Sequence, residues 1–202
     1  MGLMYENINY LADIIEQKYT AQKIKQDYLS GKNRKFVLFW GHRKSKDGSI
    51  TKSCLSQWWH SSFTVGGVTY NCMEQFMMAS KAKLFGDNEI FEKIMQTKTQ
   101  KTIKDLGRKV RNFDSKVWDE HKFTIVYYGN LMKFSQNEEL KSFLLSTGKK
   151  ILAEASPYDG IWGIKLPQED ERAQIPVKWQ GENLLGFALM QVRDELSKGD
   201  TI

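Results

Sequence analysis

The sequence has few of the residues that build disulfide frameworks and metal centres. Its 202 residues include two cysteines, three histidines and three prolines. Cys54 and Cys72 are too few for a disulfide framework or a zinc set, so we expect two unlinked thiols in a reducing cytoplasm. The histidines, His42, His60 and His121, show no metal-ligand spacing, so we expect no metal site. The scarcity of proline argues against disordered and collagen-like chains.

Long apolar runs and the common cofactor motifs are also missing. The longest apolar stretch, residues 184–190, contains Gly186 and is far shorter than the roughly 20 residues of a membrane span. Glu6 and Asp13 near the start are at odds with a signal peptide. The chain has no Gly-rich phosphate loop, no Gly-x-Ser-x-Gly elbow and no His-Glu-x-x-His motif. We therefore expect a protein without a membrane partner and without a cofactor.

Positive charge, by contrast, is present in excess and is unevenly spread. Thirty Lys and Arg oppose 24 Asp and Glu, for a net charge of +6. Residues 23–46 hold eight bases and one acid, and residues 98–111 hold six bases and one acid. These two segments suit an anionic partner, either a phosphate-bearing small molecule or nucleic acid. A solvated basic surface is the alternative.

The hydrophobic spacing predicts a helix-rich α+β domain around a small β-sheet, with an extra N-terminal helix over residues 5–29. We divide the chain into an N-terminal helical extension, 1–35, and a main domain, 36–202. A hairpin is expected at residues 63–70, where Gly66-Gly67 separates β-forming residues. Further helices are expected over about 71–85, from 87 onward, and over 99–110, 114–133, 136–145 and 183–196. Further short strands are expected at 36–40, 151–155 and 161–164.

The helix over residues 71–85 carries a carboxylate and an amine on one face. Glu74 and Lys81 are seven residues apart, which places their Cα atoms about 10.5 Å apart along the helix axis. Met77 and Met78 lie between them. This spacing suits two groups that flank a bound ligand in a pocket wall. Alternatively, Glu74 compensates the helix N-terminus and Lys81 is solvated.

Two further segments could take part in binding. Residues 154–163 contain a turn with Asp159 followed by Trp162, on which a base could stack; a structural turn with a core tryptophan is the alternative. Lys101, Lys104, Arg108 and Arg111 form one cationic helix face at spacings of three and four. That face could meet phosphate, or could simply be solvated, as we expect for Lys101 and Arg111.

Read together, short motifs form an ordered series along residues 36–197. They are Phe39-Trp-Gly-His42, Leu55-Ser-Gln-Trp58, Gly67-Val-Thr-Tyr70, Glu74-Gln-Phe-Met-Met-Ala-Ser-Lys81, Lys104-Asp-Leu-Gly-Arg108, Trp118-Asp119, Gly129-Asn130, Lys133-Phe-x-Gln136, Leu144-Leu-x-Thr-Gly148, Glu154-Ala-Ser-Pro-Tyr-Asp159, Trp162-Gly163, Gly181-x-Asn-Leu-Leu-Gly186 and Leu189-Met-x-Val-Arg193. This series resembles the NADAR superfamily, whose bacterial members include the riboflavin-intermediate N-glycosidases. The chain departs from those members at Ser56-Gln57-Trp58 and Glu74-Gln75-Phe76. It is more similar to the subgroup with Glu-Gln-aromatic-Met-Met.

The resemblance implies an enzyme that hydrolyses an N-glycosidic bond to ribose. Two substrate types are associated with the family: ribosylaminopyrimidine phosphates of riboflavin synthesis, and ADP-ribose attached to guanine, including guanine in nucleic acid. In both, ribose C1′ is bonded to an exocyclic amine. The subgroup pattern favours ADP-ribosylated guanine, which implies functional pairing with an ADP-ribosyltransferase. A non-catalytic ADP-ribose or NAD reader is the alternative of another class.

The resemblance also implies roles for individual residues. The implied catalytic residues are Glu74, Lys81 and Asp159; the implied substrate-binding residues are Trp40, Gly41, Ser56, Lys104, Arg108, Trp162, Gly163 and Asn183. In one mechanism, Glu74 or Asp159 stabilises an oxocarbenium-like state and activates water. In the other, a neutral Lys81 attacks C1′ of the opened sugar and forms a transient Schiff base, with Glu74 moving protons.

Overall fold

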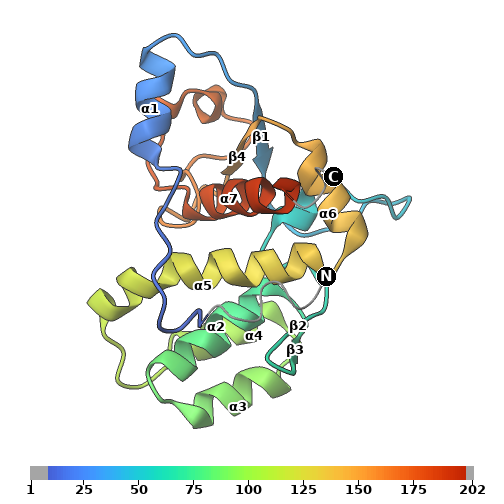
Figure 1. Ribbon diagram of the computed structural model, residues 1–202, viewed down its shortest axis with the longest axis vertical. Helices are drawn as coiled ribbons and strands as arrows, with labels where there is room; N and C mark the ends of the chain where they lie inside the picture. The colour runs from blue at the N-terminus through green and yellow to red at the C-terminus, as the bar shows by residue number, and fades with distance from the viewer. Residues whose placement is uncertain (1–8, 199–202) are drawn as a thin grey trace. The chain divides into compact units, whose positions relative to one another are not determined.

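The computed structural model describes residues 9–198 and divides them into two compact units. Unit 1 comprises residues 9–15 and 57–137, and unit 2 comprises residues 16–56 and 138–198. Figure 1 shows the elements of both units. Unit 1 holds β2 (Phe63–Val65), β3 (Val68–Tyr70), α2 (Met73–Leu84), α3 (Asn88–Gln96), α4 (Gln100–Gly107) and α5 (Ser115–Ser135). Unit 2 holds α1 (Ala21–Leu29), β1 (Phe36–Phe39), η2 (Lys52–Leu55), α6 (Glu138–Ser146), β4 (Ile151–Glu154), η3 (Glu171–Gln174), η4 (Pro176–Lys178) and α7 (Leu184–Lys198).

The centre of unit 1 is α2, which packs against α3, α4 and α5. Nine of its twelve residues are buried, so its sequence shows no polar stripe. Two glycines let neighbouring helices approach it closely. A Cβ at Gly107 of α4 would overlap the Met78 side chain, and a Cβ at Gly129 of α5 would overlap Phe76 and lie 2.8 Å from Cε of Met73. The absence of these side chains sets the distance of α4 and α5 from α2.

Local signals define the ends of several elements of unit 1. Gly66 and Gly67 both have positive φ, 55° and 77°, as the predicted two-residue hairpin turn requires. Asp87 caps α3 by accepting a hydrogen bond from the Ile90 N–H, and Asp114 caps α5 in the same manner. These boundaries agree with the sequence prediction. The start of α2 differs, because Cys72 rather than Asn71 is its N-cap.

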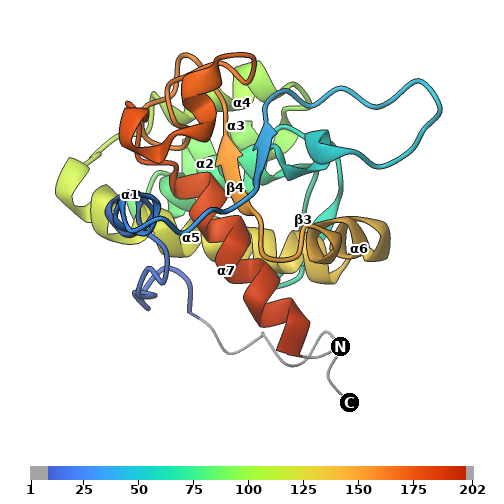
Figure 2. The ribbon, with the colours of Figure 1, turned by 90° about the horizontal axis from the view of Figure 1, so that it is seen from above.

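Unit 2 is built on a two-stranded parallel sheet. β1 pairs with β4 from Phe36 opposite Ile151 to Phe39 opposite Glu154, and α7 packs against β4 (Figure 2). Gly186 permits this packing, since a Cβ there would overlap the carbonyl oxygen of Leu152. Together with the antiparallel β2–β3 pair, the described residues contain two small sheets. The prediction of a helix-rich α+β fold is confirmed.

Two predicted elements are wrong. The N-terminal helix begins at Ala21, after the Thr20 cap, and residues 9–20 contain only turns, a bend and irregular backbone; residues 5–8 lie outside the described part of the chain. The strand predicted at 161–164 is absent from the described structure. The reason is Asp159, whose Oδ1 accepts hydrogen bonds from the N–H groups of Ile161 and Trp162 and folds this segment into a turn.

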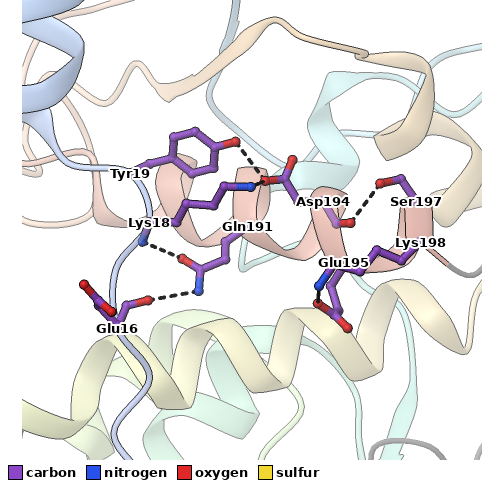
Figure 3. A network of polar contacts seen from close by, with 8 residues as sticks. All are labelled: Glu16, Lys18, Tyr19, Gln191, Asp194, Glu195, Ser197 and Lys198. Atoms are coloured by element: carbon purple, nitrogen blue, oxygen red, sulfur yellow. Dashed lines mark hydrogen bonds and ion pairs between the residues drawn. The ribbon is translucent and has the colours of Figure 1, made fainter.

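The segment before α1 is not helical, and its polar groups bond to α7. Figure 3 shows the Nζ of Lys18 and the hydroxyl of Tyr19 meeting Oδ2 of Asp194. Gln191 accepts from the Lys18 N–H at 3.0 Å and donates to the carbonyl oxygen of Glu16 at 3.1 Å. These contacts compete with helix formation, which explains why local periodicity misled the prediction here.

Tyr10 belongs to unit 1 and joins its aromatic core. Its ring stacks on Tyr128 with centroids 5.1 Å apart and an interplanar angle of 11°, and it meets Phe76 at 5.1 Å. Burial raises the pKa of its hydroxyl. Residues 9–20 therefore form an arm that contributes to the packing of both units. The boundary predicted at residue 35 stays a prediction.

Candidate functional site

The predicted site residues fall into two groups, one in each unit. The group in unit 1 comprises Glu74, Lys81, Lys104 and Arg108. The group in unit 2 comprises Trp40, Gly41, Ser56, Asp159, Trp162, Gly163 and Asn183.

Glu74 lies in the first turn of α2 and is 3% exposed. Its N–H donates to the carbonyl oxygen of Gln57 at 2.9 Å, which ties the helix start to the preceding segment. The positive end of the helix dipole favours an ionised carboxylate here. The neighbouring Cys72 thiol reports the local charges: burial raises its pKa most, the Glu74 charge raises it further, and the Lys133 charge lowers it.

Lys81 lies two turns along α2 in a half-buried aromatic setting. Its Nζ donates to the carbonyl oxygen of Gly107 at 3.0 Å and lies 4.1 Å from the ring centroid of Phe113 and 5.5 Å from that of Trp118. Desolvation by this packing lowers the pKa of the amine. A lysine whose neutral form is favoured in this way is suited to nucleophilic attack on a carbonyl or imine carbon.

The two methionines between Glu74 and Lys81 are packing residues. Met77 is 3% exposed and Met78 is 8% exposed. Met78 fills the space over Gly107, where a Cβ would collide with its side chain. The expectation that they frame an open pocket wall is therefore corrected, because both side chains are buried.

The predicted cationic face of α4 divides into engaged and accessible cations. Arg111 bonds to both carboxylate oxygens of Asp87 and meets Glu89 at 3.2 Å. Arg108 is 70% exposed at its side chain, with Asp105 at 3.6 Å. The Nζ of Lys104 lies 6.0 Å from the Trp58 ring. Lys101 and Arg108 are exposed and Lys104 is half-buried, so these three are more accessible to an incoming phosphate than the paired Arg111.

In unit 2 an exposed aromatic pair follows β1. Trp40 is 48% exposed, and its ring lies 6.4 Å from that of Tyr158, which is 85% exposed. Gly41, directly after Trp40, has φ of 81°, a conformation that favours glycine. Such a pair provides an accessible face on which a base can stack.

The other residues of this group have structural contacts. Asp159 directs Oδ1 to two backbone N–H groups of its own turn; the half-buried Trp162 follows in that turn. Ser56 is buried at the end of η2. Gly163 is a close-approach glycine, since a Cβ would lie 2.7 Å from the carbonyl oxygen of Glu154. Asp159 thus directs an oxygen to the backbone of its own turn. Glu74 is instead buried in α2, and Lys81 is desolvated.

Asn183 lies directly before α7 and bonds to β4. It is fully buried, and its Oδ1 accepts from the Glu154 N–H at 3.0 Å while its Nδ2 donates to the Leu152 carbonyl at 2.9 Å. Its φ is 57°. Both ends of the amide bond to β4, and the substrate contact implied for Asn183 stays a prediction.

The sequence predicts Trp58, Trp59, Trp118 and Trp179 to be packing residues and assigns no role to Phe113. Trp58, Phe113 and Trp118 lie against Lys104 or Lys81, and nothing in the linear spacing links them. The sequence also assigns no role to Lys133, which is fully buried in α5. The available signal was a lysine within the apolar stretch Leu131-Met-Lys-Phe134. Trp59 and Trp179 are buried, as predicted for packing residues.

Two further findings delimit the site. Among residues 9–198, no three His, Cys, Asp or Glu side chains gather as a metal cluster would. A groove of about 530 Å³ in unit 2 is lined by Phe36, Val37, Leu38, Lys52, Gln168, Glu169 and Gln174. Since none of the predicted site residues lines this groove, we do not assign the chemistry to it.

The chain is similar to proteins of known family along most of its length. Residues 38–197 match the NADAR domain. N-glycosidase R617 of Acanthamoeba polyphaga mimivirus is 48% identical over 167 residues, which cover 80% of this chain and 96% of that protein. The chloroplastic riboflavin biosynthesis protein PYRR of Arabidopsis thaliana is 37% identical over 94 residues, 46% of this chain and 13% of that protein.

A solved structure shares the fold. The NMR structure of Escherichia coli YbiA superimposes with a TM-score of 0.66 at 24% identity, covering 83% of this chain and 88% of that chain. In sequence, the protein named N-glycosidase YbiA is 27% identical over 117 residues, 58% of this chain and 66% of that protein. The helix-rich architecture around small sheets is therefore that of YbiA. The chain belongs to the NADAR domain family, and its match to the mimivirus protein along most of both chains identifies it as an N-glycosidase.

Proposed function

We propose that this N-glycosidase cleaves the bond between ribose C1′ and an exocyclic base amine, and that its substrate is ADP-ribosylated guanine. The observation that carries the proposal is Lys81, a desolvated lysine seven residues after the buried carboxylate of Glu74 on the same helix. An exocyclic amine at C1′ has a lone pair that opens the sugar ring to an imine. A neutral amine nucleophile suits that opened form.

The proposed reaction proceeds in two steps through Lys81. Its neutral Nζ attacks C1′ of the opened sugar, the bond from C1′ to the base amine breaks, and the base leaves with a proton. A Schiff base between Nζ and C1′ remains. Water then adds to C1′, and the C1′–Nζ bond breaks to release ADP-ribose with an aldehyde at C1′ and return the free amine. Glu74 takes and returns the protons. If the sugar stays closed, Glu74 instead stabilises an oxocarbenium-like state and activates water.

The remaining groups suit an ADP-ribosyl substrate. Lys104 and the exposed Arg108 offer charge-assisted bonds to a diphosphate. Trp40 with Tyr158, and separately Trp162, offer faces for an adenine or guanine ring. The Glu-Gln-aromatic-Met-Met pattern at residues 74–78 supports guanine over a riboflavin intermediate, and the basic segments would assist with a nucleic-acid substrate.

We further propose a cellular setting from these properties. An ADP-ribosyltransferase would supply the substrate, because the attached group is ADP-ribose. Cys54 and Cys72 are not joined in a disulfide, which fits a reducing cytoplasm. Within residues 9–198, the structure contains no helix of the length and apolarity that crossing a membrane requires.

A second candidate substrate has its own support. The similarity to PYRR over 94 residues favours a ribosylaminopyrimidine phosphate of riboflavin synthesis. The purified protein should be mixed with ADP-ribosylated guanosine and, separately, with a ribosylaminopyrimidine phosphate, and the free base or nucleoside followed by chromatography. Release of guanosine at the higher kcat/KM supports the proposal, and faster cleavage of the pyrimidine supports the second candidate. Binding without release of either product would favour a reader and contradict both.

A further inference from the structure

Lys133 of α5 is a charged side chain with no exposed surface. Its relative exposure is 0%, and it ranks among the largest fully buried side chains of the described chain. A buried ammonium is costly unless an anion and hydrogen bonds compensate it. Its Nζ lies 4.9 Å from the Phe134 ring, a contact that supplies only part of such compensation. The position of Lys133 therefore requires a physical reason.

The packing of α5 directs Lys133 toward the start of α2. Gly129, one turn earlier, lies against Met73 and Phe76 of α2, and residues four apart share a helix face. One turn later, the Gln136 side chain accepts from the Thr64 N–H and donates to the Thr64 carbonyl, both at 2.8 Å. Lys133 lies between these two anchors. This part of α5 thus faces the hairpin and the first turn of α2.

The buried charge of opposite sign in this region belongs to Glu74, which is 3% exposed. The Cys72 thiol, at the N-cap of α2, experiences the charges of both Glu74 and Lys133. The other buried titratable groups around this turn include Tyr70 of β3 and Tyr127 and Tyr128 of α5, and Tyr10 packs against Phe76 of α2.

Among the remaining described neighbours of α2, the buried charge is Asp87 at the N-cap of α3, which Arg111 pairs. The buried residues of α3 are Ile90 and Ile94, and those of α4 are Ile103 and Gly107. Among the groups named around Glu74, Lys133 is therefore the cation. Burial disfavours a charged carboxylate, whereas a nearby buried ammonium stabilises it.

We propose that Lys133 is a positioning residue whose buried ammonium keeps the Glu74 carboxylate ionised and oriented for its part in N-glycoside cleavage. The inference rests on the proposed function, in which Glu74 accepts and returns protons. Lys133 acts through Glu74 and does not itself meet the substrate. Its role is distinct from that of Lys81, which is half-buried and bonded to a backbone carbonyl.

The first test is the pH dependence of kcat/KM with ADP-ribosylated guanosine. Lys133→Met keeps a long apolar side chain and removes the charge, so the acidic limb should move to higher pH by one unit or more. Lys133→Arg keeps the charge and should leave the limb near that of the unsubstituted protein. Lys122→Met is the matched control, because Lys122 lies on the same helix but pairs with Asp119 at 2.7 Å; its limb should not move. An unmoved limb in an active Lys133→Met protein would overturn the proposal.

The second test does not depend on activity. Thermal midpoints are measured for Glu74→Gln, Lys133→Met and the double variant. If the two charges compensate each other, the double variant is more stable than Lys133→Met alone, since no buried carboxylate is left without its cation. Strict additivity of the two losses would overturn the pairing. If Lys133→Met alone fails to fold, a folded double variant supports the pairing and an unfolded one overturns it. If the unsubstituted protein cleaves neither substrate, the proposed function fails, and the midpoints still decide whether the pair exists.

Discussion

The Nζ atom of Lys81 donates a hydrogen bond to the carbonyl oxygen of Gly107 at 3.0 Å. This bond joins the last turn of α2 to the end of α4 and gives the amine a neutral partner. A carboxylate in that place would hold the amine in its charged form. Lys81 is thus held in place by a contact that permits it to lose its proton.

Borohydride trapping tests Lys81 as the nucleophile. With substrate and borohydride, we expect the mass of one sugar adduct on the peptide that contains Lys81, because reduction fixes the Schiff base. Lys81→Met should form no adduct and lose activity by on the order of 10³-fold. Lys83→Met is the control, since Lys83 lies two residues away with its Nζ 4.6 Å from the Phe91 ring. Peptide mapping that finds no adduct in an active enzyme would contradict the Schiff-base route.

The rate of the chemical step should rise with pH and then reach a plateau. The midpoint of the rise should lie below 10.5, the ordinary pKa of lysine. Burial lowers the pKa of Lys81, so more of the amine is neutral at a given pH than for a solvated lysine. Single-turnover rates across neutral and alkaline pH provide the measurement. A midpoint at or above 10.5 would show that desolvation does not activate this amine.

Gly129→Ala should destabilise unit 1 by about 1–3 kcal/mol, because the added methyl overlaps Phe76 and Met73 in a packed core. Denaturant unfolding measures this loss. Lys116→Ala, at an exposed position of the same helix, should stay within about 0.5 kcal/mol. Equal stability of the two variants would mean that α5 can move away from α2 at little cost.

Asn183→Ala should lower stability by about 1–3 kcal/mol, because the buried N–H of Glu154 and the carbonyl of Leu152 lose a partner. Asn183→Asp keeps an acceptor for the Glu154 N–H but places an oxygen against the Leu152 carbonyl oxygen. It should therefore be destabilised as well. Unfolding free energies and KM should be measured for both. A raised KM with unchanged stability would instead support the substrate contact predicted from the sequence.

The sequence predicted best where one residue determines the local backbone. Gly66-Gly67 specified the hairpin, and Asp87 and Asp114 marked the starts of α3 and α5, because each of these signals acts within three residues. Residues 9–20 were misread because their conformation depends on α7, which lies far along the chain. Local periodicity contains no information on such a partner.

In the candidate site, too, the sequence predicted local positions but not contacts between distant segments. The spacing of Glu74 and Lys81 placed both on α2, and the family resemblance singled them out. Neither could show that Met78 fills the space over Gly107, or that the Asn183 amide bonds to β4. These roles depend on the approach of two backbones, which only the folded chain reveals. Lys133 was passed over because burial, rather than spacing, makes a lysine notable.

The arm at residues 9–20 lies before the stretch that matches the NADAR domain, which begins at residue 38. A chain shortened to the matched residues would lose Tyr10 from the faces of Phe76 and Tyr128, and Lys18 and Tyr19 from Asp194. The uncovered rings of Phe76 and Tyr128 would form an exposed apolar patch, and such patches promote aggregation. The solubility of the expressed protein would therefore depend on residues 9–20, which lie outside the residues that match the NADAR domain.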